Sequence, residues 1–118
     1  MSFASGDIVL IPDAPYTNRL DVKARPCLVI SGSQFNKINP DVILAPISSN
    51  IRFEDPKQVI IQTDNPVFTQ TGLKYSSAIK CGAIFAYTKN QIRRKLGTVP
   101  VEVLNEVRKI IVDILTTD

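Results

Sequence analysis

The side chains that most enzymes use for proton transfer and nucleophilic attack are scarce in this chain. It has no histidine, and its two cysteines, Cys27 and Cys81, are far apart in the sequence. A Ser-His-Asp or Cys-His catalytic unit therefore cannot form, and no carboxylates cluster at the spacing of metal ligands. The glycines form neither a Walker-type loop nor a G-x-G-x-x-G fingerprint, so no cradle for a nucleotide is visible.

The groups that remain are arginine, lysine, serine, threonine and tyrosine side chains near the ends of apolar runs. These groups suit metal-free cleavage of RNA, in which a ribose hydroxyl attacks the neighbouring phosphorus. Such a reaction requires a proton acceptor, a proton donor and cations that stabilise the crowded phosphorane. Arginine supplies the cation well because its forked N–H donors match two phosphate oxygens, but its high pKa makes it a poor base.

Length and composition predict a single globular domain over residues 1–118. A chain of 118 residues that is 44% hydrophobic and 21% charged can bury a core without disulfides or metals. The net charge of +3 permits a polyanionic partner but is only weak evidence for one. The first twelve residues resemble neither a signal peptide nor a membrane span, so we expect a cytoplasmic protein.

Short apolar runs separated by proline, glycine, asparagine and aspartate dominate the first three quarters of the chain, a pattern typical of a small β-barrel. Both cysteines fall inside such runs, so we expect buried, reduced thiols rather than reactive ones. The predicted strands are Asp7–Pro12, Pro26–Ser31, Val42–Ser48, Gln58–Gln62 and Ser77–Tyr87.

One segment has the pattern of a long helix. After Pro100, apolar residues recur at three- and four-residue spacing as far as Leu115, which predicts an amphipathic helix with one apolar face. A shorter helical turn is expected at residues 89–92. Two loops, 13–24 and 50–57, are long for a small domain, and loops of that length are commonly functional.

The order of these features resembles the MazF/PemK family of toxin endoribonucleases over nearly the whole chain. The first three segments that carry the resemblance are GDIVLIP at residues 6–12, ARPCLVIS at 24–31 and DVILAPISSNI at 41–51. The fourth is YSSAIKCGAIFAYTKNQIRRKLGTVPVEVLNEV at residues 75–107. They resemble an opening strand, an Arg-Pro strand, a strand that ends in a hydroxyl residue, and a serine-containing strand followed by a Leu-Gly turn and a terminal helix.

The resemblance implies a fold and a function. The implied fold is mainly β with α, a small SH3-like β-barrel with a C-terminal helix similar to CcdB and PemK. The implied function is sequence-specific cleavage of single-stranded RNA by a cytoplasmic homodimer, with neither a metal nor another cofactor. The implied protein partner is an acidic, partly disordered cognate antitoxin whose tail lies across the basic groove and blocks RNA.

By this resemblance, Arg25 and Ser48 are the candidate catalytic residues. Arg25 matches the arginine of the family's Arg-Pro pair, a proton donor or phosphate stabiliser, and Ser48 stands where the family usually has threonine. Outside the family pattern they would be interpreted as a solvated arginine and a serine in a turn. Serine keeps the hydroxyl but rotates more freely than β-branched threonine.

Candidate RNA-binding residues lie in the first loop and near the strand ends. The first-loop side chains suit base stacking and phosphate contact, although the same residues also suit a plain turn. Ser77 either contacts RNA or braces its loop, and the basic run 93–95 is interpreted as a solvated face. The candidates are Tyr16, Thr17, Arg19, Lys23, Ser49, Ser77 and Lys80.

The chain departs from the family in its proton-transfer groups. Some PemK-type members place an arginine and an aspartate two residues apart, and the matching positions here are Lys80 and Gly82. Lys80 can still stabilise phosphate as a point charge, whereas Gly82 offers no carboxylate. The histidine of that scheme is also missing, which leaves Asp13 or a water molecule as candidate proton acceptors.

Two other functions stay open. A non-enzymatic toxin similar to the gyrase poison CcdB would bind a protein and would not need Arg25. A nucleic-acid-binding barrel that has lost catalysis is compatible with Ser48 and Gly82. Fold alone cannot separate these functions, and the combination of the Arg-Pro strand with Ser48 favours RNA cleavage.

Overall fold

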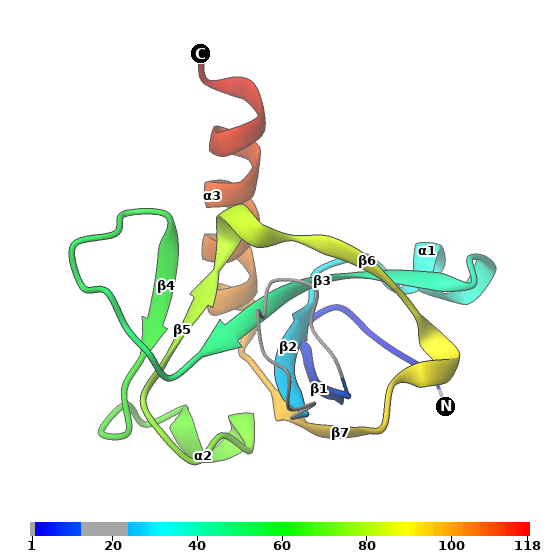
Figure 1. The fold of residues 1–118 in the computed structure, drawn as a ribbon, viewed down its shortest axis with the longest axis horizontal. Helices are drawn as coiled ribbons and strands as arrows, with labels where there is room; N and C mark the ends of the chain where they lie inside the picture. The colour runs from blue at the N-terminus through cyan, green and yellow to red at the C-terminus, as the bar shows by residue number, and fades with distance from the viewer. Residues whose placement is uncertain (1, 13–23) are drawn as a thin grey trace.

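A computed structural model describes residues 2–12 and 24–118. In chain order the first elements are β1 (Asp7–Ile11), β2 (Arg25–Val29), α1 (Ser33–Ile38), β3 (Asp41–Ser48), β4 (Gln58–Ile61) and α2 (Phe68–Thr71). They are followed by β5 (Ser77–Lys80), η1 (Cys81–Ala83), β6 (Phe85–Thr88), η2 (Lys89–Gln91), β7 (Arg94–Thr98) and α3 (Val101–Thr116). The strands curl into a half-barrel and α3 ends the chain, which confirms the predicted mainly β fold with a C-terminal helix (Figure 1).

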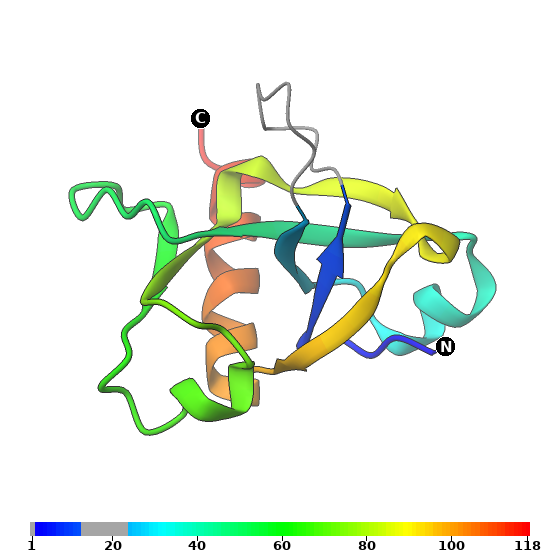
Figure 2. The ribbon, with the colours of Figure 1, turned by 60° about the horizontal axis from the view of Figure 1, so that its bottom comes forward.

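The long strand β3 organises the sheet, and it runs across the whole molecule (Figure 2). The strand order is β4-β5-β3-β2-β1-β7, and β6 pairs with β3 beside β5. The first half of β3 pairs with β6 from Asp41 to Leu44, and its end pairs with β5 at Ile47 and Ser48. One strand therefore connects both halves of the curled sheet.

The prediction of one continuous strand over Ser77–Tyr87 is wrong in the middle of that range. The structure divides it into β5 and β6, with the 3₁₀ turn η1 between them. At this turn the buried Cys81 side chain joins the core, and the Cys81 N–H donates to the Lys57 carbonyl at 3.2 Å. Before the turn, β5 pairs with both β3 and β4, and after the turn, β6 pairs with β3. Apart from Lys80, residues 77–87 are apolar or small, and no proline or cluster of polar turn residues marks the turn.

The strands are apolar on both faces because each face covers its own core. Ile8 and Leu28 belong to one core, and their chain neighbours Val9 and Cys27 belong to the other. This follows from the alternation of side chains along a strand.

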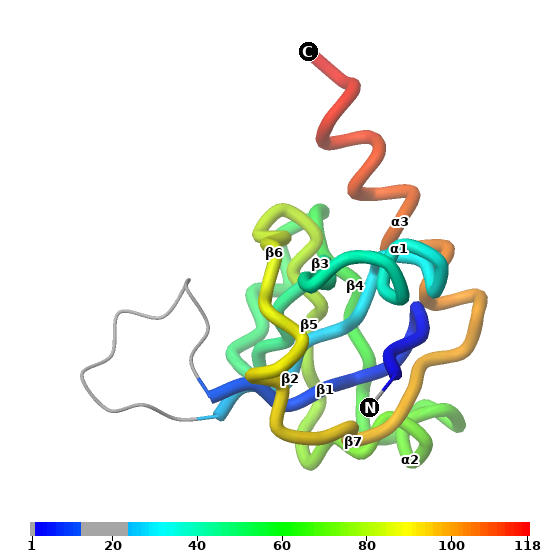
Figure 3. The backbone as a smooth tube through the Cα atoms, turned by 90° about the vertical axis from the view of Figure 1, so that its right-hand side faces the viewer, coloured from blue at the N-terminus to red at the C-terminus, as the bar shows by residue number. Residues whose placement is uncertain are grey.

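Helix α3 covers the first core and confirms the helix predicted after Pro100. Its residues Leu104, Val107 and Ile111 are buried at helical spacing. The Arg108 guanidinium donates twice to the Ile30 carbonyl, at 3.1 and 2.8 Å, which fastens the helix to the chain after β2. The C-terminal end of α3 extends beyond the strands (Figure 3). No helix in the described ranges is long and apolar enough to cross a membrane.

Both cysteines are buried and unpaired, as predicted. Burial raises the pKa of the Cys27 thiol to about 12. Burial also raises the pKa of Cys81 to about 11, with the Glu106 and Asp55 carboxylates adding to the effect. Because only the thiolate is a strong nucleophile, both thiols are unreactive near neutral pH.

The elements α1, α2 and β7 were not among the predicted ones. The two helices span six and four residues, too short for a helical period to show. Strand β7 contains Gly97, a residue that usually weakens a strand. The short turn at Lys89–Gln91, in contrast, confirms the predicted helical turn at 89–92.

Gly72 and Gly97 allow the segment around α2 to lie directly against β7 (Figure 2). A Cβ on Gly97 would lie 2.2 Å from the Gln70 carbonyl oxygen, and one on Gly72 would lie 2.0 Å from the Leu96 carbonyl oxygen. Gly72 also has a φ of +72°, in the left-handed region that favours glycine. Side-chain bonding supports the contact, since Gln70 Nε2 donates to Thr98 Oγ1 at 3.1 Å.

We expect Gly97→Ala to lower the free energy of unfolding by about 1–3 kcal/mol, because the new methyl group must push one backbone segment away from the other. Denaturant unfolding of purified variants measures this. Gly82→Ala is the matched control, since Gly82 has no positive φ and a Cβ there meets only the Ile114 side chain, at an ordinary contact distance of 3.8 Å. The control should stay within about 0.5 kcal/mol of the parent chain. Equal stability of the two variants would contradict the close contact.

Candidate functional site

A pocket of about 410 Å³ opens where β1, β2, β3 and β7 meet the segment between α2 and β5. This volume lies in the range of small-ligand sites, roughly 300–1,000 Å³. Its apolar lining comes from Leu10, Pro26, Ile47, Leu73 and Leu96. Its polar lining includes Arg25, Ser48, Ser49, Lys74, Tyr75, Ser77 and Arg94.

The sheet brings the two candidate catalytic residues to one end of the ladder between β2 and β3. Cys27 pairs with Pro46, the last pair of that antiparallel ladder, and Arg25 and Ser48 each lie two residues beyond it and line the pocket. Ser48 pairs in turn with Ala78 of β5, so Ser77 lies at the next position. Residues that are far apart in the sequence thus line one pocket.

A β-bulge in β7 brings a second arginine to the same place. Ile8 pairs with Gly97 but Val9 pairs with Lys95, so Leu96 is the extra residue. Beyond the bulge, Arg94 pairs with Leu10. As a result both Arg94 and Leu96 line the pocket.

The glycine contact supplies the remaining wall. Gly72 ends α2 and lies against β7, and Leu73, Lys74 and Tyr75 follow it along the pocket. Without the close approach of the two backbones, these side chains would lie further from Arg94.

The pocket is cationic because none of the described residues that line it balances its positive charge. Arg25, Lys74 and Arg94 line it together with no carboxylate. Within residues 2–12 and 24–118, none of these three side chains has an ion-pair or hydrogen-bond partner. Arg25 is half-buried, so less water screens its charge than that of a fully exposed arginine. Such a pocket favours an anion.

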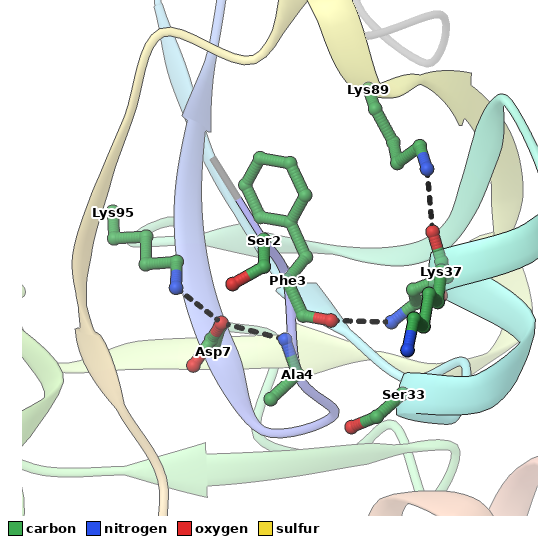
Figure 4. Close-up of a pocket in the computed structure, with 9 residues that line it drawn as sticks. Ser2, Phe3, Ala4, Asp7, Ser33, Lys37, Lys89 and Lys95 are labelled. Atoms are coloured by element: carbon green, nitrogen blue, oxygen red, sulfur yellow. Dashed lines mark hydrogen bonds and ion pairs between the residues drawn. The ribbon is translucent and has the colours of Figure 1, made fainter.

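A second pocket, of about 470 Å³, is larger, but most of its lysines already have partners within the protein (Figure 4). Lys95 lies 3.3 Å from the Asp7 carboxylate and over the Phe3 ring, with its Nζ 5.7 Å from the ring centroid. Lys89 Nζ donates to the Asn36 carbonyl at 2.6 Å. Two of its three lysines are therefore already engaged, which makes the smaller pocket the better anion site.

The serine hydroxyls of the candidate site have defined partners. Ser48 Oγ accepts a hydrogen bond from the Asn50 N–H at 3.1 Å. This bond restrains a side chain that lacks the β-branch of threonine, and it leaves the hydroxyl hydrogen for a ligand oxygen. Ser77 is buried and its hydroxyl donates to the Tyr75 carbonyl at 2.7 Å. Ser77 therefore braces the loop, one of its two predicted roles.

The structure brings four predicted site residues together, namely Arg25, Ser48, Ser49 and Ser77. It places Lys80 at the other end of β5, about 10 Å along the strand from Ser77. There Lys80 Nζ donates to Gln58 Oε1 at 2.8 Å, and this geometry does not support its predicted contact with RNA. Gly82 lies in η1 and is not part of the pocket lining. Asp13, Tyr16, Thr17, Arg19 and Lys23 lie outside the described residues.

Residues 93–95 are all exposed, which agrees with their interpretation as a solvated face. In addition, Arg94 lines the candidate site, whereas Lys95 lines the second pocket and pairs with Asp7. Sequence reasoning missed Arg94 because β7 was not among the predicted strands, so its pairing with β1 was not expected. It also missed Tyr75, although a tyrosine beside Lys74 next to a predicted strand was an available signal. Among the described residues, no three histidine, cysteine, aspartate or glutamate side chains group as metal ligands would.

Solved structures share this fold at low sequence identity. An endoribonuclease from a mycobacterial species, solved in complex with its cognate antitoxin, is 18% identical, with a TM-score of 0.76 over 99% of this chain and 98% of its own. The MazE–MazF complex from Deinococcus radiodurans is 20% identical, with a TM-score of 0.76 over 100% and 99%. The Mycobacterium tuberculosis toxin MazF-mt6 is 18% identical, with a TM-score of 0.71 over 94% and 98%.

The sequence itself is matched by a family model but by no individual curated protein. No curated protein sequence is significantly similar to this chain. The model of the PemK-like, MazF-like toxins of type II toxin–antitoxin systems matches residues 4–115, which include every described element that lines the pocket. The chain therefore belongs to the PemK-like, MazF-like toxin family of type II toxin–antitoxin systems.

Proposed function

We propose that this toxin is a metal-independent, sequence-specific endoribonuclease that cleaves single-stranded RNA in the pocket around Arg25 and Ser48. The observation that carries the proposal is a cationic pocket to which residues 2–12 and 24–118 contribute no carboxylate, and whose wall includes both Arg25 and Ser48. A phosphodiester is the anion that such a mixture of guanidinium and hydroxyl groups fits. The family match over residues 4–115 supports the same activity.

The proposed reaction is an internal transesterification. The 2′-hydroxyl attacks the adjacent phosphorus, the bond from phosphorus to the 5′-oxygen breaks, and a 2′,3′-cyclic phosphate and a 5′-hydroxyl form. One proton leaves the 2′-hydroxyl and another reaches the 5′-oxygen, so the step needs no added reactant. The proton acceptor is Asp13 or a water molecule in this proposal.

Arg25 and Ser48 have separate roles in the proposed reaction. In this proposal the Arg25 guanidinium stabilises the charge on the phosphorane and donates a proton to the leaving oxygen. Cations and donors aimed at developing charge commonly contribute the largest part of such a rate enhancement. The Ser48 hydroxyl donates a hydrogen bond to a phosphate oxygen while the Asn50 N–H holds its Oγ in place.

We also propose an acidic antitoxin segment as the protein partner, which covers this pocket and competes with RNA. Two solved structures with this fold contain an antitoxin, and three unpaired cations suit an acidic peptide as well as a phosphate. The homodimer implied by the resemblance remains a prediction, which light scattering of the purified chain tests. Cytoplasmic action is proposed with it, and cell fractionation tests that.

The first prediction concerns cleavage itself. We expect the purified chain to cut a defined single-stranded RNA in EDTA and to leave a cyclic phosphate and a 5′-hydroxyl, as product-end analysis would show. Arg25→Ala should slow cleavage by about 100-fold or more. Ser48→Ala should also slow cleavage. Ser48→Thr keeps the hydroxyl, so its cleavage rate should stay close to that of the parent chain. Intact RNA with the folded, antitoxin-free parent chain would contradict the proposal and favour a protein target or binding without turnover.

The second prediction concerns Arg94 and uses its neighbour as a control. Arg94→Ala should weaken binding of a single-stranded oligonucleotide and lower the slope of log K against log salt by about 0.7, because one phosphate contact is lost. Arg93→Ala removes the same charge from a side chain outside the pocket lining, so its effect should be smaller. Fluorescence anisotropy at several salt concentrations measures both. Equal effects would show that only net charge matters.

The third prediction concerns the antitoxin. Saturating cognate antitoxin should displace a labelled oligonucleotide from the toxin, since both need the same cations. Arg25→Ala and Arg94→Ala should weaken binding of both ligands, whereas Arg93→Ala should leave antitoxin binding nearly as it was. Competition anisotropy reads out the displacement. Unchanged oligonucleotide binding in the presence of bound antitoxin would contradict the shared site.

A further inference from the structure

Tyr75 is a large aromatic side chain exposed at the candidate site, and it is the only aromatic residue that residues 2–12 and 24–118 contribute to the pocket lining. Its exposed fraction is 67%. Leaving an aromatic ring in water forgoes the stabilisation that its burial would supply. An exposed ring beside unpaired cations is the arrangement found in single-stranded nucleic-acid sites, where aromatic faces stack on bases and cations hold the backbone.

The backbone that carries Tyr75 is held from both sides, although its ring is exposed. The Ser77 hydroxyl donates to the Tyr75 carbonyl at 2.7 Å, and the Thr63 N–H donates to Ser76 Oγ at 2.9 Å. Strand β5 begins at Ser77, and Gly72 fixes the other end of the segment against β7. Because the backbone is already ordered, a ligand that contacts the ring loses little further conformational entropy.

We propose that the Tyr75 ring is the stacking platform for the nucleobase next to the phosphate bound by the pocket, and that Ser77 is its positioning residue. The proposal rests on the proposed function and names how the same site holds its substrate. A base within a duplex already has its faces covered by its neighbours, so a stacking platform selects unpaired RNA. Every base has a π-face, so Tyr75 contributes affinity for single strands rather than the choice of sequence.

The binding test uses a tryptophan as the reporter, because the chain has none of its own. The Tyr75→Trp variant is titrated with a short, mixed-sequence 2′-O-methyl oligoribonucleotide, which transesterification cannot cleave. Phe53→Trp is the matched control, since Phe53 is also 67% exposed but is not part of the pocket lining. We expect binding to quench the emission of the Tyr75→Trp variant and to leave that of the Phe53→Trp variant nearly unchanged.

The kinetic test separates the ring from its hydroxyl group. Tyr75→Leu should raise KM for single-stranded RNA by about 5- to 100-fold, the range expected for one lost base–aromatic stack, with a smaller change in kcat. Tyr75→Phe keeps the ring and should recover most of that loss. The cleavage sequence should stay the same in both variants. A changed cleavage sequence would show that Tyr75 reads base edges instead.

The role of Ser77 is tested through Tyr75. Ser77→Ala removes the hydrogen bond to the Tyr75 carbonyl and should raise KM. Ser77→Thr keeps the hydroxyl, so its KM should stay close to that of the parent chain. In a chain that already carries Tyr75→Leu, Ser77→Ala should add little to KM, because the residue acts through the ring. A full, additive effect in the double variant would overturn the positioning role. Denaturant unfolding of each variant distinguishes lost folding from lost positioning.

The outcomes distinguish the two proposals. Oligonucleotide binding without quenching in the Tyr75→Trp variant, together with an unchanged KM in Tyr75→Leu, would overturn stacking and leave RNA cleavage standing. Quenching without cleavage by the parent chain would support stacking and contradict the nuclease activity. Absence of oligonucleotide binding by every folded variant would overturn both.

Discussion

The direct contact between two backbone segments at Gly72 and Gly97 is the constraint on which the candidate site depends. Any Cβ at either position would overlap a carbonyl oxygen of the other segment. The contact brings the segment after α2 onto β7, and Lys74 and Tyr75 reach the pocket as a result. The pocket is therefore a product of tertiary packing. Strands form part of its wall, and the rest comes from the segment between α2 and β5, which lies close to β7 only because both contact positions are glycine.

The charge distribution of the site follows from that packing. Arg25, Lys74 and Arg94 come from three separate segments, and the described part of the pocket lining gives them no carboxylate. Gathering like charges is unfavourable unless an anion joins them, so this arrangement is typical of a functional site rather than of a stabilising one. Lys95, one residue beyond Arg94, shows the opposite case, because Asp7 balances its charge in the second pocket.

The roles of the two serines show how the same side-chain type serves different purposes. Ser48 keeps its hydroxyl hydrogen for a ligand because its oxygen accepts from the Asn50 N–H. Ser77 uses its hydrogen to hold the Tyr75 carbonyl. The family resemblance pointed to both, but only their hydrogen bonds separate a hydroxyl whose hydrogen is not used within the described structure from one that donates to the backbone.

The sequence by itself determined the elements whose patterns are local. Short apolar runs bounded by turn residues indicated most strands, three- and four-residue spacing indicated α3, and the ordered segments indicated the family with Arg25 and Ser48. Burial of Cys27 and Cys81 followed from their apolar neighbours. These features depend on contacts that each stretch of chain makes through its own repeating geometry.

Only the tertiary structure decided how distant segments meet. The turn at Cys81–Ala83, the bulge at Leu96 and the contact between Gly72 and Gly97 depend on partners far along the chain, so no local pattern marks them. These features bring Arg94 and Tyr75 into the candidate site, and the direction of β5 places Lys80 away from it. Membership of the pocket is set by strand register and backbone approach, which a periodic pattern in one segment cannot encode.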